Sequence, residues 1–535
     1  MSVHFDHHSL SFESTGRFSK TVLDYLQNDP QLKSFYLYRP DKEGIRKAIE
    51  NRKKFPVNRK LLVEELTRQY KQIPDSEKVI ENIRLLADEQ TFTVCTAHQP
   101  NIFTGHLYFI YKILHAIRLA EDCKKAFPEN NFVPVFFMGS EDADLDELNH
   151  FELEGKLYKW DTSQKGAVGR MKPDKALSRL VSEVEGRLLT EPFGEEIVAN
   201  LKTCYIKSAN IEEGTFLFTH WLFHQYGLIV FLPDNAVYKK EMQAVFEDDL
   251  FTHSAQSIVT QTSKSLAAYY HAQAYPRDIN LFYMKEDTRE RIIEKKEGFS
   301  INNTDIHFSK EELKEELRNH PERFSPNVIL RGLLQEKLLP GIIFVGGGGE
   351  LAYWLQLKDL FEHFNVPYPV LYLRNSFLVV EKKWKERIAR LHLTIPEIFR
   401  KEGDLVRDFT MQHAPYPLSL PDERASIRNL FREMELKAGQ VDITLQPHVQ
   451  ALFKGVDKKL GTLEKKMLAA EKRKQEDAIR QLQQLLQAVF PGGGLQERSE
   501  NFMLFYARWG NRFIEALHDA SPSFDAAFCV LEERK

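Results

Sequence analysis

The chain has 535 residues, which leaves room for about two to four domains and excludes explanations that suit small scaffolds. Its 77 acidic and 73 basic residues give a net charge of −4 with histidine neutral, so the composition does not indicate a nucleic-acid or anionic-membrane partner. Aromatic residues make up 12% of the chain, which excludes a disordered protein and favours large packed interiors.

Cysteine usage and the first residues predict a cytoplasmic protein. The four cysteines show no CxxC spacing, so neither a disulfide framework nor a thiolate metal site is expected. The first twenty residues lack an apolar stretch behind a basic start, so export is not expected. Two uncharged stretches, 91–111 and 214–233, contain histidines and other polar side chains that hydrocarbon would penalise, so no membrane span is predicted.

The first 90 residues are predicted to form an N-terminal helical segment. From 41 to 90 the sequence is charged, and apolar residues recur at spacings of three and four, as in NRKLLVEELTRQY.

Beyond residue 90, five short apolar runs alternate with segments of helical length. Continuous apolar runs of this kind are typical of parallel strands that are buried on both faces. Together with the helices between them, they predict a doubly wound α/β core over 91–421. The runs are Thr91–Ala97, Val133–Gly139, Leu228–Asp234, Gly341–Gly347 and Tyr368–Arg374.

Two of the connections between these runs are too long for a simple crossover and predict insertions. The first insertion, at about 149–210, combines a strand-like segment with two helices. The second, at about 277–308, alternates apolar and polar residues around turns and predicts a small antiparallel sheet.

The residues from 422 to 495 predict a helical coiled-coil arm. Apolar residues from Leu452 to Ala470 follow heptad spacing, Lys474 interrupts the seam, and the seam resumes from Ala478 with the offset of a stutter. A seam of this kind needs a partner helix, so self-association is expected. The last part, 496–535, is predicted as a helix that returns to the core.

Residues that directly follow the apolar runs are the first candidates for a site, because ligands of open α/β sheets bind at the carboxyl ends of the strands. His98 to Tyr108 follow the first run, and two imidazoles near a helix start could bind phosphate or carboxylate. The alternative is a structural turn with a threonine cap. Five carboxylates between Glu141 and Glu147 follow the second run and could cap a helix, bind a cation or hold an ammonium group. The alternative is a solvated acidic first turn.

The four glycines Gly346–Gly349 follow the fourth run and permit a close approach of backbone to a ligand. They match neither a Walker A loop nor GxGxxG. Arg374-Asn375-Ser376, after the fifth run, could reach the same crevice or cap a helix. His220 and His224 fit core histidines better than a metal pair, and Cys95 fits a buried small hydrophobe.

Taken jointly, these blocks are similar to the bacillithiol biosynthesis cysteine-adding enzyme family. The resemblance rests on HQPNIFTGHLYFIYK, VPVFFMGSEDADLDELNH, SPNVILRGLLQEKLLPGIIFVGGGGELAYW and LQERSENF, which occur in family order across most of the chain. It implies a Rossmann-like parallel sheet core with inserted connecting elements and an α-helical coiled-coil domain that makes a homodimer. It also implies a ligase that joins the carboxyl group of cysteine to the amine of glucosaminyl-malate, with ATP or ADP as the nucleotide.

The resemblance, placed on the strand ends, assigns hypothetical roles to three groups of residues. Histidines would stabilise developing charge or move a proton, and the acids would hold an ammonium group or Mg²⁺. The catalytic candidates are His98, Thr104, His106, Asp142 and Asp144. The substrate-binding candidates are Gln99, Asn101, Tyr108, Glu141, Gly347, Gly348, Glu350, Tyr353 and Trp354. The nucleotide-binding candidates are Arg374, Asn375, Ser376, Gly492, Gly493, Gly494, Gln496, Arg498 and Asn501.

Two other classes of protein stay open at this stage. The chain could be a non-catalytic dimeric scaffold or nucleotide sensor on the same fold. An Mg²⁺-dependent phosphohydrolase that uses the acidic cluster is the third hypothesis, although it lacks the expected nucleophile on a strand.

Overall fold

The computed structural model describes residues 4–55 and 57–534. They form two compact units. The first runs up to Val380 and includes the chain from Gly494 onward, and the second is Glu381–Gly493. The predicted helical arm begins at residue 422, whereas the second unit begins at Glu381.

The first unit is built on a parallel five-stranded sheet, as predicted. Each of the five apolar runs supplies one strand, and the residues of β12 are buried along its whole length. In spatial order the strands are β13 (Val370–Leu373), β12 (Gly341–Gly346), β2 (Thr91–His98), β3 (Asn131–Met138) and β6 (Ile229–Phe231). The register is parallel throughout.

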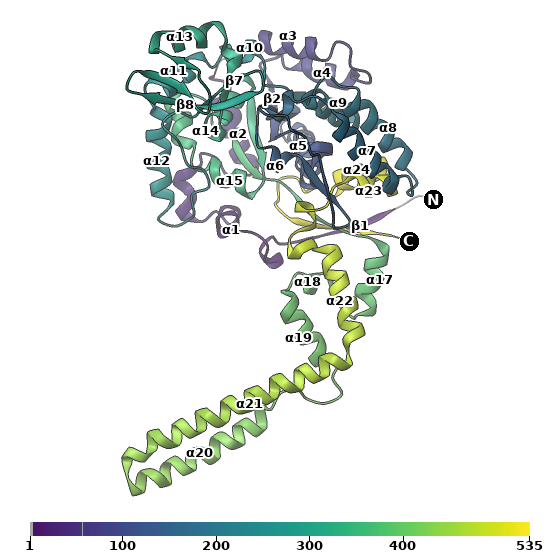
Figure 1. Ribbon diagram of the computed structural model, residues 1–535, viewed down its shortest axis with the longest axis vertical. Coiled ribbons are helices and arrows are strands. Elements are labelled where there is room, and N and C mark those ends of the chain that lie inside the picture. Colours follow the sequence, from purple (N-terminus) through teal and green to yellow (C-terminus); the bar gives the residue numbers. More distant parts are fainter. Residues whose placement is uncertain (1–3, 56, 535) are drawn as a thin grey trace. The chain divides into compact units, whose positions relative to one another are not determined.

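Helices α2 (Lys42–Arg52) and α5 (Tyr108–Ala126) cover one face of this sheet (Figure 1). Ile45 of α2 and Leu119 of α5 belong to one buried apolar cluster with Val94 of β2. Because α5 is apolar on most of its circumference, it fits the interior of a large core rather than its surface.

The other helices of the first unit connect the strands and cover the rest of the core. They are α1 (Lys20–Leu26), α3 (Arg59–Gln69), α4 (Glu77–Leu85), α6 (Leu145–Leu148), α9 (Ile211–Phe223), α10 (Ala236–Lys240), α11 (Gln243–Phe251), α12 (Ser254–Leu266), α13 (Lys310–Asn319), α14 (Val328–Leu338), α15 (Gly348–Trp354), α16 (Lys358–His363), α23 (Met503–Trp509) and α24 (Asn511–Ala520).

The two ends of the chain meet in a small sheet that the sequence did not predict. Strand β1 (Phe5–Leu10) pairs antiparallel with β15 (Phe528–Glu533), which pairs in parallel with β14 (Ser376–Val380). The segments predicted as an N-terminal helical segment and a C-terminal helix therefore each contain a strand besides their helices. The polar β1 sequence FDHHSL becomes a strand because distant β15 supplies its hydrogen bonds.

The two long connections of the sheet each contain elements beyond a simple crossover. The first contains the hairpin β4 (His150–Leu153) and β5 (Lys156–Lys159), followed by α7 (Lys175–Leu188) and α8 (Gly194–Leu201). The second is an antiparallel sheet, as expected, and is extended by one strand beyond the predicted range. Its strands are β7 (Leu281–Lys285), β8 (Thr288–Lys295), β9 (Gly298–Ile301), β10 (His307–Phe308) and β11 (Phe324–Pro326).

The second unit is helical. Its two long helices form a hairpin, in which Arg424 donates to Asp457 at 2.7 Å and to Glu464 at 3.0 Å. The predicted stutter at Lys474 is a break, because α21 ends there and Gln475 leaves helical geometry before the next helix begins. The helices are α17 (Lys382–Arg390), α18 (Ile395–Ile398), α19 (Glu402–Gln412), α20 (Pro421–Val441), α21 (Gln446–Lys474) and α22 (Glu476–Val489).

The four cysteines are free and buried. Among the helices in the described ranges, none combines the length and the apolar character that crossing a membrane requires.

Candidate functional site

A cleft of about 730 Å³ opens at the carboxyl edge of the central sheet. Four of the five strands contribute residues at or just beyond their ends: His98 of β2, Asp142 after β3, the glycine run after β12 and Arg374 after β13. The position is the one that the open-sheet rule predicts. The lining residues are Ala97, His98, Gln99, Tyr108, Gly139, Asp142, Glu147, Gln273, Ala274, Tyr275, Arg277, Phe282, Arg289, Asn327, Val328, Arg331, Gly347, Gly348, Gly349, Glu350, Tyr353, Arg374 and Arg498.

His98 is the last residue of β2 and contributes its imidazole to the cleft wall. Its Nε2 is buried and has no hydrogen-bond partner, and the ring lies edge-on to Tyr108 at 5.2 Å. Burial, with the nearby ammonium of Lys112, holds the pKa of His98 well below 6.5. The imidazole is therefore neutral at pH 7 and keeps one hydrogen-bonding atom for a ligand.

Asp142 follows β3 and lines the cleft close to Arg331. Its Oδ2 is 3.5 Å from Nη2 of Arg331 and accepts a hydrogen bond from Gln99 Nε2 at 3.3 Å. Burial disfavours the charged form, but Arg331 and Arg289 outweigh it and lower the pKa of Asp142. A carboxylate held ionised in this way can receive an ammonium group.

The other predicted acids do not converge on one point. Glu141 is buried and paired with Lys239, away from the cleft. The side chain of Asp144 is the N-cap of α6 and accepts from the backbone N–H of Glu147. Within the described ranges, no group of three or more histidine, cysteine, aspartate or glutamate side chains is arranged to hold a metal ion.

The glycine run forms the turn between β12 and α15. Gly347 is the N-cap residue of α15, and its N–H donates to Glu350 at 2.8 Å. The same oxygen of Glu350, Oε2, also accepts from Nζ of Lys112 at 2.7 Å. Lys112 is almost completely buried and also donates to the carbonyl of Ala97, so it fixes Glu350 at the cleft wall from below.

Tyr108 and Arg374 close the cleft near β13. The guanidinium of Arg374 lies 5.3 Å from the centre of the Tyr108 ring and donates to the buried Glu497 at 2.7 Å. Burial raises the pKa of Tyr108 to about 12, although Arg374 opposes this. Tyr108 therefore keeps its hydroxyl proton at neutral pH and can act as a donor.

Three predicted residues form part of the turn after β2 and do not line the cleft. Asn101 is buried and donates to the carbonyl of Glu147, and Thr104 is buried with a positive φ of 70°. Nδ1 of His106 is 2.9 Å from the carbonyl of Ser499. Asn501 donates to the carbonyls of Phe103 and Gly105, so these side chains build the turn that carries His98.

The predicted nucleotide-binding set is divided. Arg374 and Arg498 line the cleft. Asn375 donates to Ser521, Ser376 donates to Glu497, and Gln496 bonds to the backbone of Val379, so these three side chains are used inside the protein. Gly494 is in the first unit. Gly492 and Gly493 end the second unit, with φ values of 58° and 76°.

Trp354 is a core residue and not part of the cleft wall. It is stacked on Phe344 with ring centres 4.4 Å apart and packs against Phe361. Tyr353, one position earlier on α15, does line the cleft. The expectation that both aromatic rings contact substrate overlooked the rotation of about 100° between neighbouring helix positions.

Several lining residues come from the second insertion and its flanks and were not predicted. Arg289 belongs to β8, Phe282 to β7 and Arg331 to α14. Tyr275 and Arg277 lie at the start of the insertion. Arg331 lies in the SPNVILRG block, which is one of the blocks that carry the family resemblance. That block is the sequence signal that could have identified it. No local pattern distinguishes Arg289 from other basic strand residues.

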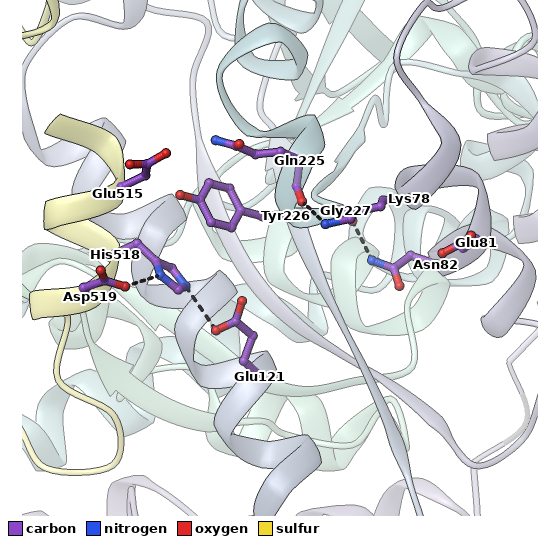
Figure 2. Close-up of a pocket in the computed structure, with 10 residues that line it drawn as sticks. All are labelled: Lys78, Glu81, Asn82, Glu121, Gln225, Tyr226, Gly227, Glu515, His518 and Asp519. Carbon is purple, nitrogen blue, oxygen red and sulfur yellow. Dashed lines mark hydrogen bonds and ion pairs between the residues drawn. The ribbon is translucent and has the colours of Figure 1, made fainter. Parts of the chain in front are cut away.

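A second cavity, of about 580 Å³, has a different character (Figure 2). It lies beside Gly227, which precedes β6, and so at the amino end of that strand. His518 stacks on Tyr226 at 4.9 Å and bridges Glu121 at 3.1 Å and Asp519 at 3.4 Å. None of its residues was predicted as a site residue.

The fold and the cleft define an α/β protein with a Rossmann-like core and a cleft lined by charged residues at its strand ends, the place where open α/β sheets bind ligands. Residues 5–375 match the family model described as bacillithiol biosynthesis BshC, N-terminal Rossmann-like domain. Residues 377–533 match the C-terminal coiled-coil domain of the same family. The chain belongs to the bacillithiol biosynthesis BshC family, which confirms the resemblance and the predicted fold class.

Curated relatives agree over almost the whole length. A protein of Cytophaga hutchinsonii is 39% identical over 531 residues, covering 99% of this chain and 99% of its own. Proteins of Flavobacterium psychrophilum and Flavobacterium johnsoniae are each 36% identical, covering 98% of this chain and 99% of their own. All three are named as candidate cysteine ligases, BshC.

Proposed function

We propose that this protein is the cysteine ligase of bacillithiol biosynthesis, which joins the carboxyl group of cysteine to the amine of glucosaminyl-malate. The observation that carries the proposal is the match to both domains of the family, together with relatives named as cysteine ligases. The reaction forms one C–N bond and breaks one C–O bond at the cysteine carboxyl carbon. The oxygen leaves with the group that activates the carboxyl, and the amine loses a proton. The non-catalytic scaffold hypothesis is not favoured, because the relatives carry the name of an enzyme.

The chemistry of the cleft supports this reaction. Asp142, Glu147 and Glu350 offer carboxyl groups to the ammonium form of an amine, and arginines offer partners to carboxylates. The neutral His98 would hydrogen-bond to the charge that develops when the amine attacks the carbonyl carbon. Three roles that the reaction needs are thus available within one cavity.

A nucleotide is part of the proposal, because a free carboxylate does not form an amide at neutral pH without activation. Of the predicted nucleotide-binding side chains in the first unit, Arg374 and Arg498 line the cleft and suit phosphate oxygens. Ser376 and Gln496 fit less well, since their polar atoms bond within the protein. Asn375 uses Nδ2 on Ser521, while its Oδ1 is buried and has no partner. The acids of the 141–147 segment diverge and give little support to Mg²⁺ at that point.

We also propose that the protein is a cytoplasmic homodimer, held through the helical hairpin of the second unit. Leu430, Met434 and Leu436 of α20 are 53%, 48% and 62% exposed, and Leu452 of α21 is 52% exposed. Apolar side chains on two neighbouring helices favour a second copy of the same hairpin as the partner. Free buried thiols fit a reducing cytoplasm.

The test is direct. Purified protein is incubated with cysteine and glucosaminyl-malate, with and without ATP and Mg²⁺, and mass spectrometry follows the amide product and the nucleotide. The proposal expects an amide product that needs both organic substrates. Absence of product from folded protein under every condition would refute the ligase assignment, and nucleotide hydrolysis that does not need cysteine would favour a phosphohydrolase.

A further inference from the structure

Two arginines of the cleft, Arg289 and Arg331, have no individual role in the function proposed above. Arg289 comes from β8 of the second insertion and Arg331 from α14, and both line the cavity. Arg331 is 23% exposed in its side chain, so its guanidinium is accessible without being free in solvent. Both influence the charge of Asp142, which places all three groups in one neighbourhood.

The two guanidinium groups have fewer carboxylate partners than they can use. Among the described residues, Asp142 is the one carboxylate within ion-pair distance of Arg331, at 3.5 Å, and none is that close to Arg289. A separation of 3.5 Å is long for a charged hydrogen bond, which is usually about 2.7–2.9 Å. Within the described ranges, Arg331 therefore has one loosely held carboxylate partner, and Arg289 has none within ion-pair distance.

Arg289 is held in position by contacts that leave its donors available. Its guanidinium carbon lies 4.0 Å from the centre of the Phe282 ring, and Nε donates to Ser325 at 3.2 Å. Stacking on an aromatic face fixes the plane of the guanidinium. Among the described residues, its two terminal nitrogens have no hydrogen-bond partner. Burial lowers the pKa of Arg289, Asp142 opposes this, and the like charge of Arg331 adds to it. A bound anion would relieve both costs.

Arg331 also has space made for it. A Cβ atom at Gly139 would come within 3.3 Å of Nη1 of Arg331, so the glycine lets the guanidinium approach the backbone that follows β3. The fork of Arg331 is thereby brought to the same strand end as Asp142.

We propose that Arg289 and Arg331 form a carboxylate-binding subsite that holds the malyl group of the amine substrate. This deepens the proposed function and depends on it for the identity of the substrate. A planar guanidinium matches a carboxylate with two parallel hydrogen bonds, and a malyl group offers two carboxylates to two such forks. The same binding would loosen Arg331 from Asp142 and leave that carboxylate to receive the amine of the same substrate.

Binding of free malate tests the subsite without any catalysis. Isothermal titration would compare the unmodified protein with Arg289→Gln, Arg331→Gln and the control Arg291→Gln, an exposed arginine of the same strand that does not line the cleft. Each cleft variant should weaken malate binding by roughly tenfold or more, as expected for losing a charge-assisted contact, and the control should bind normally. Circular dichroism checks that each variant is folded, and Arg331→Lys should recover only part of the affinity.

Three results would overturn the subsite. They are the absence of malate binding by the unmodified protein at millimolar concentration, equal binding by the cleft variants and the control, and displacement of malate by an equal concentration of inorganic phosphate. The last result would assign the pair to a phosphate group instead. Steady-state assays separate this inference from the ligase itself. A raised KM for glucosaminyl-malate with an unchanged KM for cysteine supports the subsite, whereas malate binding without any amide product refutes only the ligase.

Discussion

Two cavities of the first unit are similar in size but differ in how far their polar groups are hydrogen-bonded within the protein. The strand-end cleft measures about 730 Å³ and the cavity around His518 about 580 Å³, and both are lined by charged residues. In the cavity of Figure 2, the polar groups bond to one another. His518 bridges two carboxylates, Lys78 donates to the carbonyl of Gln225, and Asn82 donates to that of Gly227.

In the cleft, by contrast, hydrogen-bonding capacity is left unused. Nε2 of His98 is buried without a partner. Among the described residues, Arg331 has one carboxylate partner, Asp142 at 3.5 Å, and Arg289 has none within ion-pair distance. Leaving such groups unsatisfied costs free energy, which a ligand can return on binding. Unsatisfied polar groups at the carboxyl ends of strands therefore identify the site better than the size of a cavity does.

Changing one histidine in each cavity should give the largest difference between the two cavities. His98→Gln should lower kcat by about 100-fold, the usual range for losing a positioned acid, base or donor. Its stability should change little, because Nε2 makes no internal hydrogen bond. His518→Gln should leave kcat unchanged. Amide formation followed by mass spectrometry and thermal unfolding measure both variants, and equal kcat values for the two would remove His98 from the mechanism.

A pair of lysines gives the next largest effect. Lys112→Met leaves the Ala97 carbonyl and the Glu350 carboxyl group without their buried donor and should lower the free energy of unfolding by about 2 kcal/mol. Lys78→Met in the other cavity removes one exposed contact and should cost less than about 0.5 kcal/mol. Urea unfolding measures both. A Lys112 variant as stable as the Lys78 variant would show that the buried ion pair does not hold the cleft wall.

One glycine beside each cavity can be replaced by alanine, and the two changes should have different effects on stability. Gly227 has a φ of 70°, and an added Cβ would meet Nδ2 of Asn82 at 2.4 Å, so Gly227→Ala should cost about 1–2 kcal/mol of stability. Gly139 has no such backbone restriction, and Gly139→Ala should displace only the Arg331 guanidinium. Its stability should stay within about 0.5 kcal/mol of the unmodified protein, while malate binding falls by about threefold. Denaturant unfolding measures the stability of both variants, and calorimetry measures their malate binding. Normal malate binding by Gly139→Ala would contradict the role assigned to Arg331.

The central sheet could be predicted strand by strand because each parallel strand is buried on both faces and reads as a continuous apolar run. Strands β1 and β15 could not, because each is completed by a partner at the other end of the chain. The polar sequence of β1 carries no periodic signal of its own. A strand whose evidence lies in its pairing, and not in its composition, is hidden from a reading of local pattern.

The site divides in the same way. His98, Asp142 and the glycine run follow the strands directly, so the position of their strands was enough to place them at the cleft. Arg289 and Arg331 reach it through the packing of an insertion and a helix, which no spacing in the sequence encodes. The acidic segment was predicted as one cluster, whereas Lys239 and the α6 N-cap each draw one carboxylate away from it.

The smallest expected effect is a difference in pH dependence between the two histidines. In the second cavity, burial opposes protonation of His518, but the carboxylates of Glu121 and Asp519 outweigh burial and raise its pKa. The stability from this ion pair is thus fully present below the unfolded pKa of about 6.5 and is lost as pH rises through the higher folded value. His518→Gln should remove that decline, which is worth about 0.5 kcal/mol for a partly exposed pair.

For His98, stability should change with pH in the opposite direction. Its folded pKa is depressed, and the unfolded chain takes up the proton below pH 6.5. Its burial should therefore cost stability as pH falls, and His98→Gln should make the protein less sensitive to acid. Urea unfolding of both variants from pH 5 to pH 8 measures these opposite slopes, and slopes of the same sign would mean that one of the two imidazoles is not in the environment described.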